Sequence, residues 1–339
     1  MNLVSIIIPC YNEERTITQL LAGLYLQTYP RNFVEAIIAD GLSTDKTRSK
    51  IAEFQNLHPD FSVTVIDNPH RTIPAGLNAA IRAARGKYII RLDAHSVPSV
   101  DYIERCVEGL EKDLGDNVGG LWNIQPGENG WVARSIAKAA SSRLGVGDAH
   151  YRLNSRSGEV DTVPFGSFNR DRLIQLGGYD ETLLANEDYE LNTRIRLTGG
   201  KVWLDESIKS TYYARSTFTG LANQYWRYGF WKAQMIKRYP GTIRWRQILP
   251  PAFILALLVS LILSFFGSLF IFLCFAILGT YLFVLAAFGS FIAMKDRDPA
   301  FIMGVPCAIS IMHSCWGSGF LLGLVSNPKK SGISDKLVG

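Results

Sequence analysis

The stretch Lys87-Tyr-Ile-Ile-Arg-Leu-Asp-Ala-His-Ser96 joins a run of strand-forming residues to two polar side chains that can bind a metal ion. In an α/β protein the ligand crevice lies outside the carboxyl ends of the strands, and residues i and i+2 of an extended segment point the same way. Asp93 and His95 are therefore candidate ligands of one divalent cation. The same residues also fit an ordinary strand that leaves its sheet through polar residues, so the decision depends on the rest of the chain.

Strand and helix periodicities alternate around this stretch, through residues 1 to about 215. The pattern predicts an α/β fold with a parallel sheet covered by helices. A GxGxxG after the first strand and a GxxxxGK[ST] are both absent from the sequence, so dinucleotide and P-loop sites lack support. The predicted strands are Val4–Ile8, Val34–Ala39, Val63–Ile66 and Lys87–Leu92, and the predicted helices cover 17–24, the residues after an N-cap at Ser43, and 73–84.

Every predicted strand ends in polar or turn residues. Turn chemistry explains any single end, but all four together predict a crevice that binds a polar, anionic ligand through a divalent cation. Asp40 fits either a turn or an acceptor for a base or ribose donor, and Asp45 fits either a first helical turn or a loop-orienting role. The four ends are Pro9–Glu13, Asp40–Asp45, Asp67–Asn68 and Asp93–His95.

The second half of this region offers further acids and bases. Residues 163–170 predict a strand and turn, and Glu187 and Asp188 follow Asn186, a predicted N-cap, in a helix ending at residues 199–200. Acids in a first helical turn are favoured by the helix dipole alone. Gln224 and Arg227 are three residues apart and share a helix face; an arginine there can hold a pyrophosphate, although an ordinary surface helix also fits.

The C-terminal part has a different composition. The chain has 339 residues, of which 47% are hydrophobic, and a net charge of +5. Ile248–Met294 is uncharged and long enough for two membrane passes of about 20 residues each, with a turn expected at 266–268. A third apolar stretch, Phe301–Val325, contains Pro306 and several glycines, which leave open a broken or re-entrant segment.

Cations flank the first apolar stretch, and such flanks stay on the cytoplasmic side. A full third pass would put Lys329 and Lys330 outside, against this rule. The five cysteines form no CxxC pair and fit reduced thiols of a cytosol-facing protein. Because the sequence opens on a strand pattern, secretion is not expected. Aromatic residues interleaved with cations over 216–247 favour a membrane interface over an RNA-binding surface.

Four ordered motifs resemble the inverting family 2 glycosyltransferases, which have the GT-A fold and use nucleotide sugars. The resemblance covers about the first 235 residues. With the aromatic, basic segment and the hydrophobic C-terminal part, the chain is most similar to the membrane-attached glucosyltransferase type of succinoglycan exopolysaccharide synthesis. The motifs are Ser5–Glu13, Ala39–Thr47, Gly76–Asn78 with Ala84–Tyr88, and Asp93–His95.

The resemblance implies roles for particular residues. Asp188 is expected to be the catalytic base, with Glu187 beside it, and Asp93 and His95 are expected at a Mg²⁺ or Mn²⁺ ion on the diphosphate. Because His95 replaces the family's second aspartate, transition ions such as Mn²⁺ are favoured over Mg²⁺. Nucleotide-sugar binding is expected from Pro9, Tyr11, Asn12, Glu13, Asp40, Ser43, Asn78 and Asp93, and acceptor or pyrophosphate binding from Gly166, Gln224, Arg227 and Arg215.

The expected function is transfer of one sugar, from UDP-glucose, to a lipid-pyrophosphate-linked saccharide with inversion, at the inner membrane and facing the cytoplasm. Membrane lipids and other exopolysaccharide assembly enzymes are expected partners; nucleic acid is not. Two alternatives stay open: a processive polysaccharide synthase, and a non-catalytic membrane assembly protein that keeps a nucleotide-binding fold. The expected divisions are a GT-A domain at 1–215, an interface segment at 216–247, a membrane region at 248–326 and a tail at 327–339.

Overall fold

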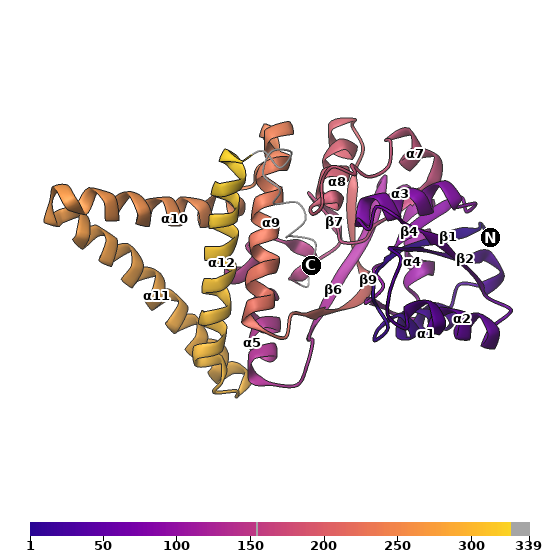
Figure 1. Cartoon of the computed structure of the whole chain (residues 1–339), viewed down its shortest axis with the longest axis horizontal. Coiled ribbons are helices and arrows are strands. Elements are labelled where there is room, and N and C mark those ends of the chain that lie inside the picture. Colours follow the sequence, from indigo (N-terminus) through magenta and orange to yellow (C-terminus); the bar gives the residue numbers. More distant parts are fainter. Residues whose placement is uncertain (154, 327–339) are drawn as a thin grey trace. The chain divides into compact units, whose positions relative to one another are not determined.

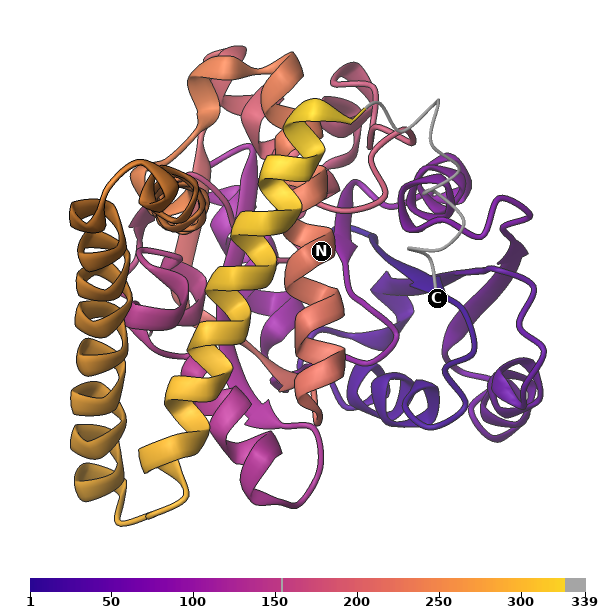
Figure 2. The ribbon, with the colours of Figure 1, turned by 60° about the vertical axis from the view of Figure 1, so that its left-hand side comes forward.

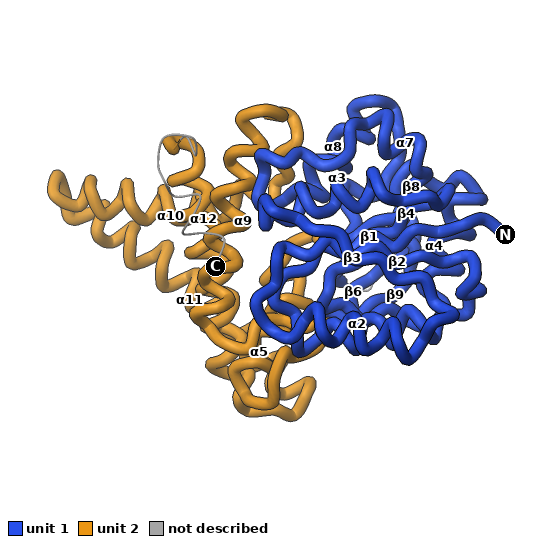
Figure 3. The backbone as a smooth tube through the Cα atoms, turned by 45° about the vertical axis from the view of Figure 1, so that its right-hand side comes forward, with its two compact units in different colours: residues 1–123, 150–212 blue, residues 124–149, 213–339 orange. Residues whose placement is uncertain are grey.

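The structure is a computed structural model that describes residues 1–153 and 155–326. The chain divides into two compact units, residues 1–123 with 150–212, and residues 124–149 with the chain from 213 onward (Figure 3). The second unit is thus not a continuous stretch of chain, and the domain limits expected from the sequence stay a prediction. The expected tail at 327–339, with Lys329 and Lys330, lies outside the described residues.

A mixed sheet organises the α/β part of the chain (Figure 1). Its strands are β1 (Val4–Cys10), β2 (Val34–Asp40), β3 (Ser62–Asp67), β4 (Tyr88–Arg91), β5 (Val97–Pro98), β6 (Asn117–Pro126), β7 (Gly158–Glu159), β8 (Ser167–Asn169) and β9 (Val202–Ala214). The order among the described residues is β3-β2-β1-β4-β8-β6-β9-β5, with β7 paired to β9. β1 pairs in parallel with β2 and β4, and β2 with β3, which confirms the four predicted strands. β8 runs antiparallel to both β4 and β6.

Helices of the first unit cover both faces of this sheet (Figure 1). They are α1 (Ile17–Tyr25), α2 (Thr47–Leu57), α3 (Ile73–Ala83), α4 (Tyr102–Glu111), α7 (Arg170–Gln175) and α8 (Glu187–Leu197), with 3₁₀ turns at η1 (Arg31–Phe33) and η2 (His150–Arg152). Along β1, Ile6 and Ile8 pack in the cluster with α1, α2 and α4, whereas Ile7 packs with α3, α7 and α8. Because both faces are covered, β1 reads as a continuous apolar run instead of an alternating one.

One of two predicted helix starts is wrong. Helix α2 begins at Thr47 with Lys46 at its N-cap, and not directly after Ser43, because Ser43 bonds to Asp40 and shapes the loop before the helix. The other is confirmed, because α8 begins at Glu187 with Asn186 at its N-cap position; Asn186 has a left-handed φ of 64° there and its side chain makes no capping hydrogen bond. Asn tolerates this conformation better than most residues.

The second unit consists mainly of helices (Figure 2). They are α5 (Trp131–Ala140), α6 (Arg143–Val146), α9 (Phe218–Arg238), α10 (Trp245–Leu263), α11 (Ser268–Asp296) and α12 (Phe301–Val325), with 3₁₀ turns at η3 (Pro240–Thr242) and η4 (Ser264–Phe266). Three segments are long and apolar enough to cross a membrane: Trp245–Phe266, Ser268–Asp296 and Phe301–Val325. The predicted turn at 266–268 is confirmed, and α12 is one unbroken helix through Pro306.

Candidate active site

The chain beyond β4 alternates between buried and accessible side chains. Leu92 and Ala94 are buried in the core, whereas Asp93 is half-buried and His95 is exposed. Asp93 and His95 are therefore the two accessible side chains of this segment, but residues 94 and 95 form a turn instead of continuing the strand, so their shared grip on one cation stays a prediction. Ser96 then closes a turn, because its backbone N–H donates to the carbonyl oxygen of Asp93 at 2.9 Å.

Arg91, the last residue of β4, joins the two acidic motifs. Its side chain is only 3% exposed, and its Nη2 lies 3.1 Å from Oδ1 of Asp93 and 3.0 Å from Oε1 of Glu187. Its Nη1 pairs with Oδ1 of Asp188. The strand end and the start of α8, almost a hundred residues apart in sequence, thus meet around one guanidinium. Sequence reasoning missed Arg91, although a cation inside an apolar strand is a signal because buried charges need partners.

This arrangement changes the acidity of Asp188. Burial raises its pKa from the ordinary 3.8 to about 8; the Arg91 guanidinium opposes the rise, and the carboxylates of Glu187 and Asp93 add to it. Because one guanidinium is shared among three carboxylates, its attraction does not offset burial, the largest cause, together with the repulsion from the other two acids. A carboxyl group with such a pKa can take up and release a proton near neutral pH, as a general base must.

His95 extends the site toward the loop after β1. Its Nδ1 lies 2.9 Å from Oε1 of Glu13. Over residues 1–153 and 155–326, no three His, Cys, Asp or Glu side chains gather closely enough to enclose a metal ion. The metal site expected at Asp93 and His95 stays a prediction; with only these two protein ligands, an ion would need its remaining ligands from a diphosphate and water.

The loops after β1 and β2 are joined by hydrogen bonds. The backbone N–H of Asn12 donates to Oγ of Ser43 at 2.9 Å, and Oδ1 of Asn12 accepts from the backbone of Thr44 at 2.9 Å. The carboxylate of Asp45 accepts from the backbone of Glu14 at 3.1 Å, so Asp45 orients the loop and lies before α2, not in its first turn. Two segments predicted to bind the nucleotide therefore form one preorganised wall.

Asp40 is fully buried at the base of this wall. Its Oδ2 lies 2.5 Å from Nε of Arg48, and its Oδ1 accepts from Oγ of Ser43 at 2.5 Å. Arg48 also reaches Oδ1 of Asp67 at 2.5 Å. Asp40 thus holds the loop, while its predicted contact with a base or ribose stays a prediction. Arg48, which the sequence analysis did not single out, ties the ends of β2 and β3 together.

Tyr11 and Pro9 differ in their surroundings. Pro9 is buried within β1, where it pairs with Ala39 of β2. Tyr11 is 44% exposed, and its ring covers Gly41, where an added Cβ would lie 3.1 Å from Cδ2. The guanidinium of Arg71 lies 5.8 Å from the centre of the same ring. An exposed aromatic face beside a cation is suited to stacking with a base.

Asn78 and Gly166 form hydrogen bonds that hold neighbouring segments of the site in place. The amide of Asn78 donates to the carbonyl oxygen of Tyr179 and accepts from its N–H, both at 2.8 Å, so it fixes the loop that precedes α8. Gly166 has a φ of 84°, and its carbonyl oxygen accepts from the backbone of Arg91 at 3.0 Å. Phe165 before it has a φ of 62°, a conformation that costs energy for a bulky residue and often marks a functional site. Direct ligand contacts of Asn78 and Gly166 stay predictions.

The remaining predicted residues belong to the second unit. Gln224 and Arg227 lie on α9, as expected, and Nε2 of Gln224 donates to the hydroxyl of Tyr228 at 3.2 Å. Arg215 is exposed just before that helix. Their predicted roles at the pyrophosphate stay predictions.

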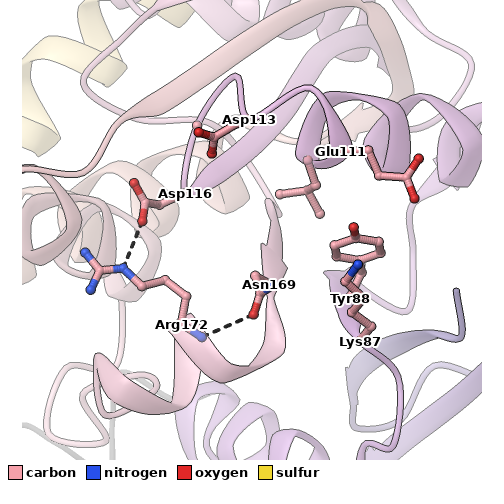
Figure 4. Close-up of a pocket in the computed structure, with 9 residues that line it drawn as sticks. Lys87, Tyr88, Glu111, Asp113, Asp116, Asn169 and Arg172 are labelled. Atoms are coloured by element: carbon pink, nitrogen blue, oxygen red, sulfur yellow. Dashed lines mark hydrogen bonds and ion pairs between the residues drawn. The ribbon is translucent and has the colours of Figure 1, made fainter.

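A hollow of about 460 Å³ lies at the opposite end of β4 (Figure 4). Lys87 and Tyr88 at the start of that strand line it, together with Asp116, whose carboxylate pairs with Arg172 at 2.8 Å. Because ligands of α/β folds bind at the carboxyl ends of the strands, we do not assign the donor to this hollow.

The fold and the acidic side chains at the strand ends define a class: a GT-A-like α/β transferase joined to apolar helices able to cross a membrane. The sequence profile described as Glycosyl transferase family 2 matches residues 5–174, which is half of the 339 residues. The chain belongs to the glycosyl transferase family 2.

Relatives extend the similarity beyond the profile. Succinoglycan biosynthesis protein ExoA of Rhizobium meliloti is 29% identical over 317 residues, which cover 93% of each chain. A Methanococcus voltae protein named dolichyl N-acetyl-alpha-D-glucosaminyl phosphate 3-beta-D-2,3-diacetamido-2,3-dideoxy-beta-D-glucuronosyltransferase is 29% identical over 331 residues, 96% of this chain and 98% of that one. A mannosyltransferase of Pyrobaculum calidifontis, solved with GDP-Man and Mn²⁺, has a TM-score of 0.63 at 18% identity, over 97% of this chain and 88% of that one. This likeness confirms the fold.

Proposed function

We propose that this glycosyltransferase moves a single sugar, glucose from UDP-glucose, with inversion onto a lipid-pyrophosphate-linked saccharide at the cytoplasmic face of a membrane. The observation that carries the proposal is the meeting of Asp93, Glu187 and Asp188 around Arg91. The similarity to a succinoglycan biosynthesis protein over nearly the whole chain supports exopolysaccharide synthesis as the setting. The three apolar helices support a lipid-linked acceptor.

In this proposal Asp188 accepts the proton of the acceptor hydroxyl as that oxygen attacks the anomeric carbon. Glu187 raises the pKa of Asp188 and so increases its strength as a base. Arg91 fixes the carboxylates relative to the end of β4, so that the base and the donor-binding end of the sheet keep one geometry. A divalent cation bound by Asp93 and His95 would neutralise charge on the leaving nucleoside diphosphate.

The test measures transfer from radiolabelled nucleotide sugars to membrane lipid extracts by the purified protein, with Mn²⁺ or Mg²⁺. Asp188→Asn keeps the shape but removes the base, and we expect a loss of transfer of at least a hundredfold. Asp171→Asn, on an exposed carboxylate of α7, is the matched control and should leave transfer unchanged. Near-normal transfer by Asp188→Asn would show that the mechanism is wrong.

The metal preference is tested with His95→Asp. Imidazole suits transition ions and carboxylate suits Mg²⁺, so the wild type should prefer Mn²⁺ and the variant should gain activity with Mg²⁺. An unchanged ratio of the activities with Mn²⁺ and Mg²⁺ would show that His95 does not bind the metal.

A further inference from the structure

Helix α12 lies alongside α9 in both ribbon views (Figure 1 and Figure 2). A Cβ added to Gly319 would lie 2.4 Å from the backbone oxygen of Trp226, and one added to Gly323 would lie 2.6 Å from that of Phe230. The two helices therefore touch backbone to backbone over the second half of α12. The contacts advance in the same direction along both helices, so α9 and α12 run parallel to one another.

The first half of α12 is covered by helices α5 and α6. A Cβ on Gly304 would lie 2.0 Å from Oγ of Ser135 in α5. Nε2 of His313, at the middle of α12, lies 3.0 Å from the carbonyl oxygen of Leu144 in α6. Other helices of the second unit therefore pack against α12 along its whole length, from its first turn to its last.

Polar side chains of α5 and α9 also bind both ends of α12 through an ion pair and hydrogen bonds. Arg134 of α5 pairs at 3.0 Å with Asp298, three residues before the helix. At the other end, Lys237 of α9 donates to the carbonyl oxygen of Ser326 at 2.7 Å, and Gln234 donates to that of Gly323 at 2.7 Å.

These neighbours decide where α12 can lie in a bilayer. If α12 crossed the hydrocarbon, α9 would lie in it too and would carry Arg227 and Lys232 near its middle, at about 2.5–3.5 kcal/mol for each central cation on insertion scales. The other two candidate spans are more apolar than α12. The mean hydropathy is 2.5 for the α10 span and 2.6 for α11, against 1.4 for α12. In the most apolar part of each span, only 11% of the residues are buried within the protein for α10 and 6% for α11, against 39% for α12.

We propose that α10 and α11 alone cross the bilayer, as a hairpin, and that α12 lies with α9 and α5 in the lipid headgroup region. The exposed apolar side chains of α12 then contact the boundary between headgroups and acyl chains. In this arrangement Lys295 at the end of α11 lies on the same face of the membrane as Arg244 and Arg246 at the start of α10, in agreement with the charge bias of membrane proteins. The exposed apolar side chains are Ile302, Met303, Leu322, Leu324 and Val325.

Single cysteines test this topology in bacterial membrane vesicles. Cys274, Cys307 and Cys315 are first replaced by Ala, while the buried Cys10 and Cys106 stay. A membrane-impermeant maleimide should label Gly267→Cys, in the α10–α11 turn, from one side of the membrane. It should label Lys295→Cys and Ser326→Cys only from the other side. Labelling of Ser326→Cys from the side of Gly267→Cys would overturn the proposal.

A second measurement keeps all native side chains. A short epitope fused after Gly339 is probed with protease in intact cells and in inverted vesicles. Digestion only in inverted vesicles is expected, since the C-terminus and α9 then share the cytoplasmic side. Digestion in intact cells would place the C-terminus across the membrane and require α12 to be a third pass.

Discussion

At the scale of single residues, Arg91 determines the geometry of the candidate active site. Its guanidinium is the cation that contacts Asp93, Glu187 and Asp188 together. Removing one partner from a buried ion network leaves uncompensated charge, which costs about 3–5 kcal/mol. We therefore expect Arg91→Met to lower the denaturation midpoint in detergent strongly and to abolish sugar transfer.

Two companion variants separate charge from shape. Arg91→Lys keeps the cation but loses the planar fork that serves several carboxylates at once, so it should fold and lose most activity. The double variant Arg91→Met/Glu187→Gln removes one acid with the cation and should recover part of the lost stability. Equal midpoints for the single and double Met variants would show that repulsion between the carboxylates is not the cause.

The raised pKa of Asp188 predicts how the reaction depends on pH. A base must be ionised to work, so kcat/KM should rise about tenfold per pH unit up to about pH 8 and then level off. Because Glu187 contributes to the rise in pKa, Glu187→Gln should move this limb to lower pH. A pH profile of the purified protein, with and without this substitution, measures both; a limb that stays in place would remove Glu187 from the explanation.

The same shift has the opposite sign for stability. The folded protein holds a proton on Asp188 that the unfolded chain releases above its ordinary pKa of 3.8. The contribution of this group to stability is therefore full below about pH 3.8, falls as the pH rises from there to about 8, and changes no further above that pH. The folded state thus loses stability when Asp188 is ionised, while the raised pKa makes Asp188 a stronger base. Such perturbed pKa values are common at active sites.

Sequence reasoning located the acids but not the cations between them. Asp93, Glu187 and Asp188 stand in recognisable motifs, and the structure brings them together. The partners of Arg91 and Arg48 depend on which strands become neighbours, and the pattern of hydrophobic residues does not specify that order. Asp40 illustrates the limit: its carboxylate is buried and bonded to Arg48 and Ser43, which no local signal in the sequence reveals.

At the scale of elements, strands with both faces covered were predicted well, because a continuous apolar run of this length has few other uses. The antiparallel strand β8 lies within residues 163–170, which were predicted as a strand and turn, whereas β6 and β9 were not predicted, since their pairing joins residues far apart in the sequence. The start of α2 was predicted from Ser43, a good capping residue in general. The hydroxyl of Ser43 instead donates to Asp40 and accepts from the backbone of Asn12, so it does not cap α2.

Packing between α9 and α12 gives a prediction at the same scale. Gly319→Ala places a methyl group 2.4 Å from the backbone oxygen of Trp226, so the helices must separate. Overpacking of this kind costs about 1–3 kcal/mol, and we expect a lower denaturation midpoint in detergent. Gly279→Ala in α11 is the matched control, because nothing lies within 4 Å of the added Cβ. Equal midpoints for the two variants would argue against close contact of α9 and α12.

At the scale of the whole molecule, charge and hydrophobicity make different predictions about membrane attachment. The net charge of +5 and the cations around α9 favour anionic lipids, but this attraction is screened by salt. The exposed apolar surfaces of α10 and α11 are much larger, with side chains such as Phe272, Phe275 and Phe283 that are 67%, 68% and 74% exposed. Burial of that surface in lipid does not weaken as salt is added.

We therefore expect the protein to stay with the membrane pellet in 1 M salt and in alkaline carbonate, and to dissolve only in detergent. The variant Phe283→Arg puts a cation on the lipid-facing side of α11 near its middle, at a cost of about 2.5–3.5 kcal/mol at the bilayer centre. Quantitative blotting of pellet and supernatant should then show a carbonate-soluble fraction that the wild type lacks. Release of the wild type by salt alone would mean that the cations, and not the α10–α11 hairpin, hold the chain to the membrane.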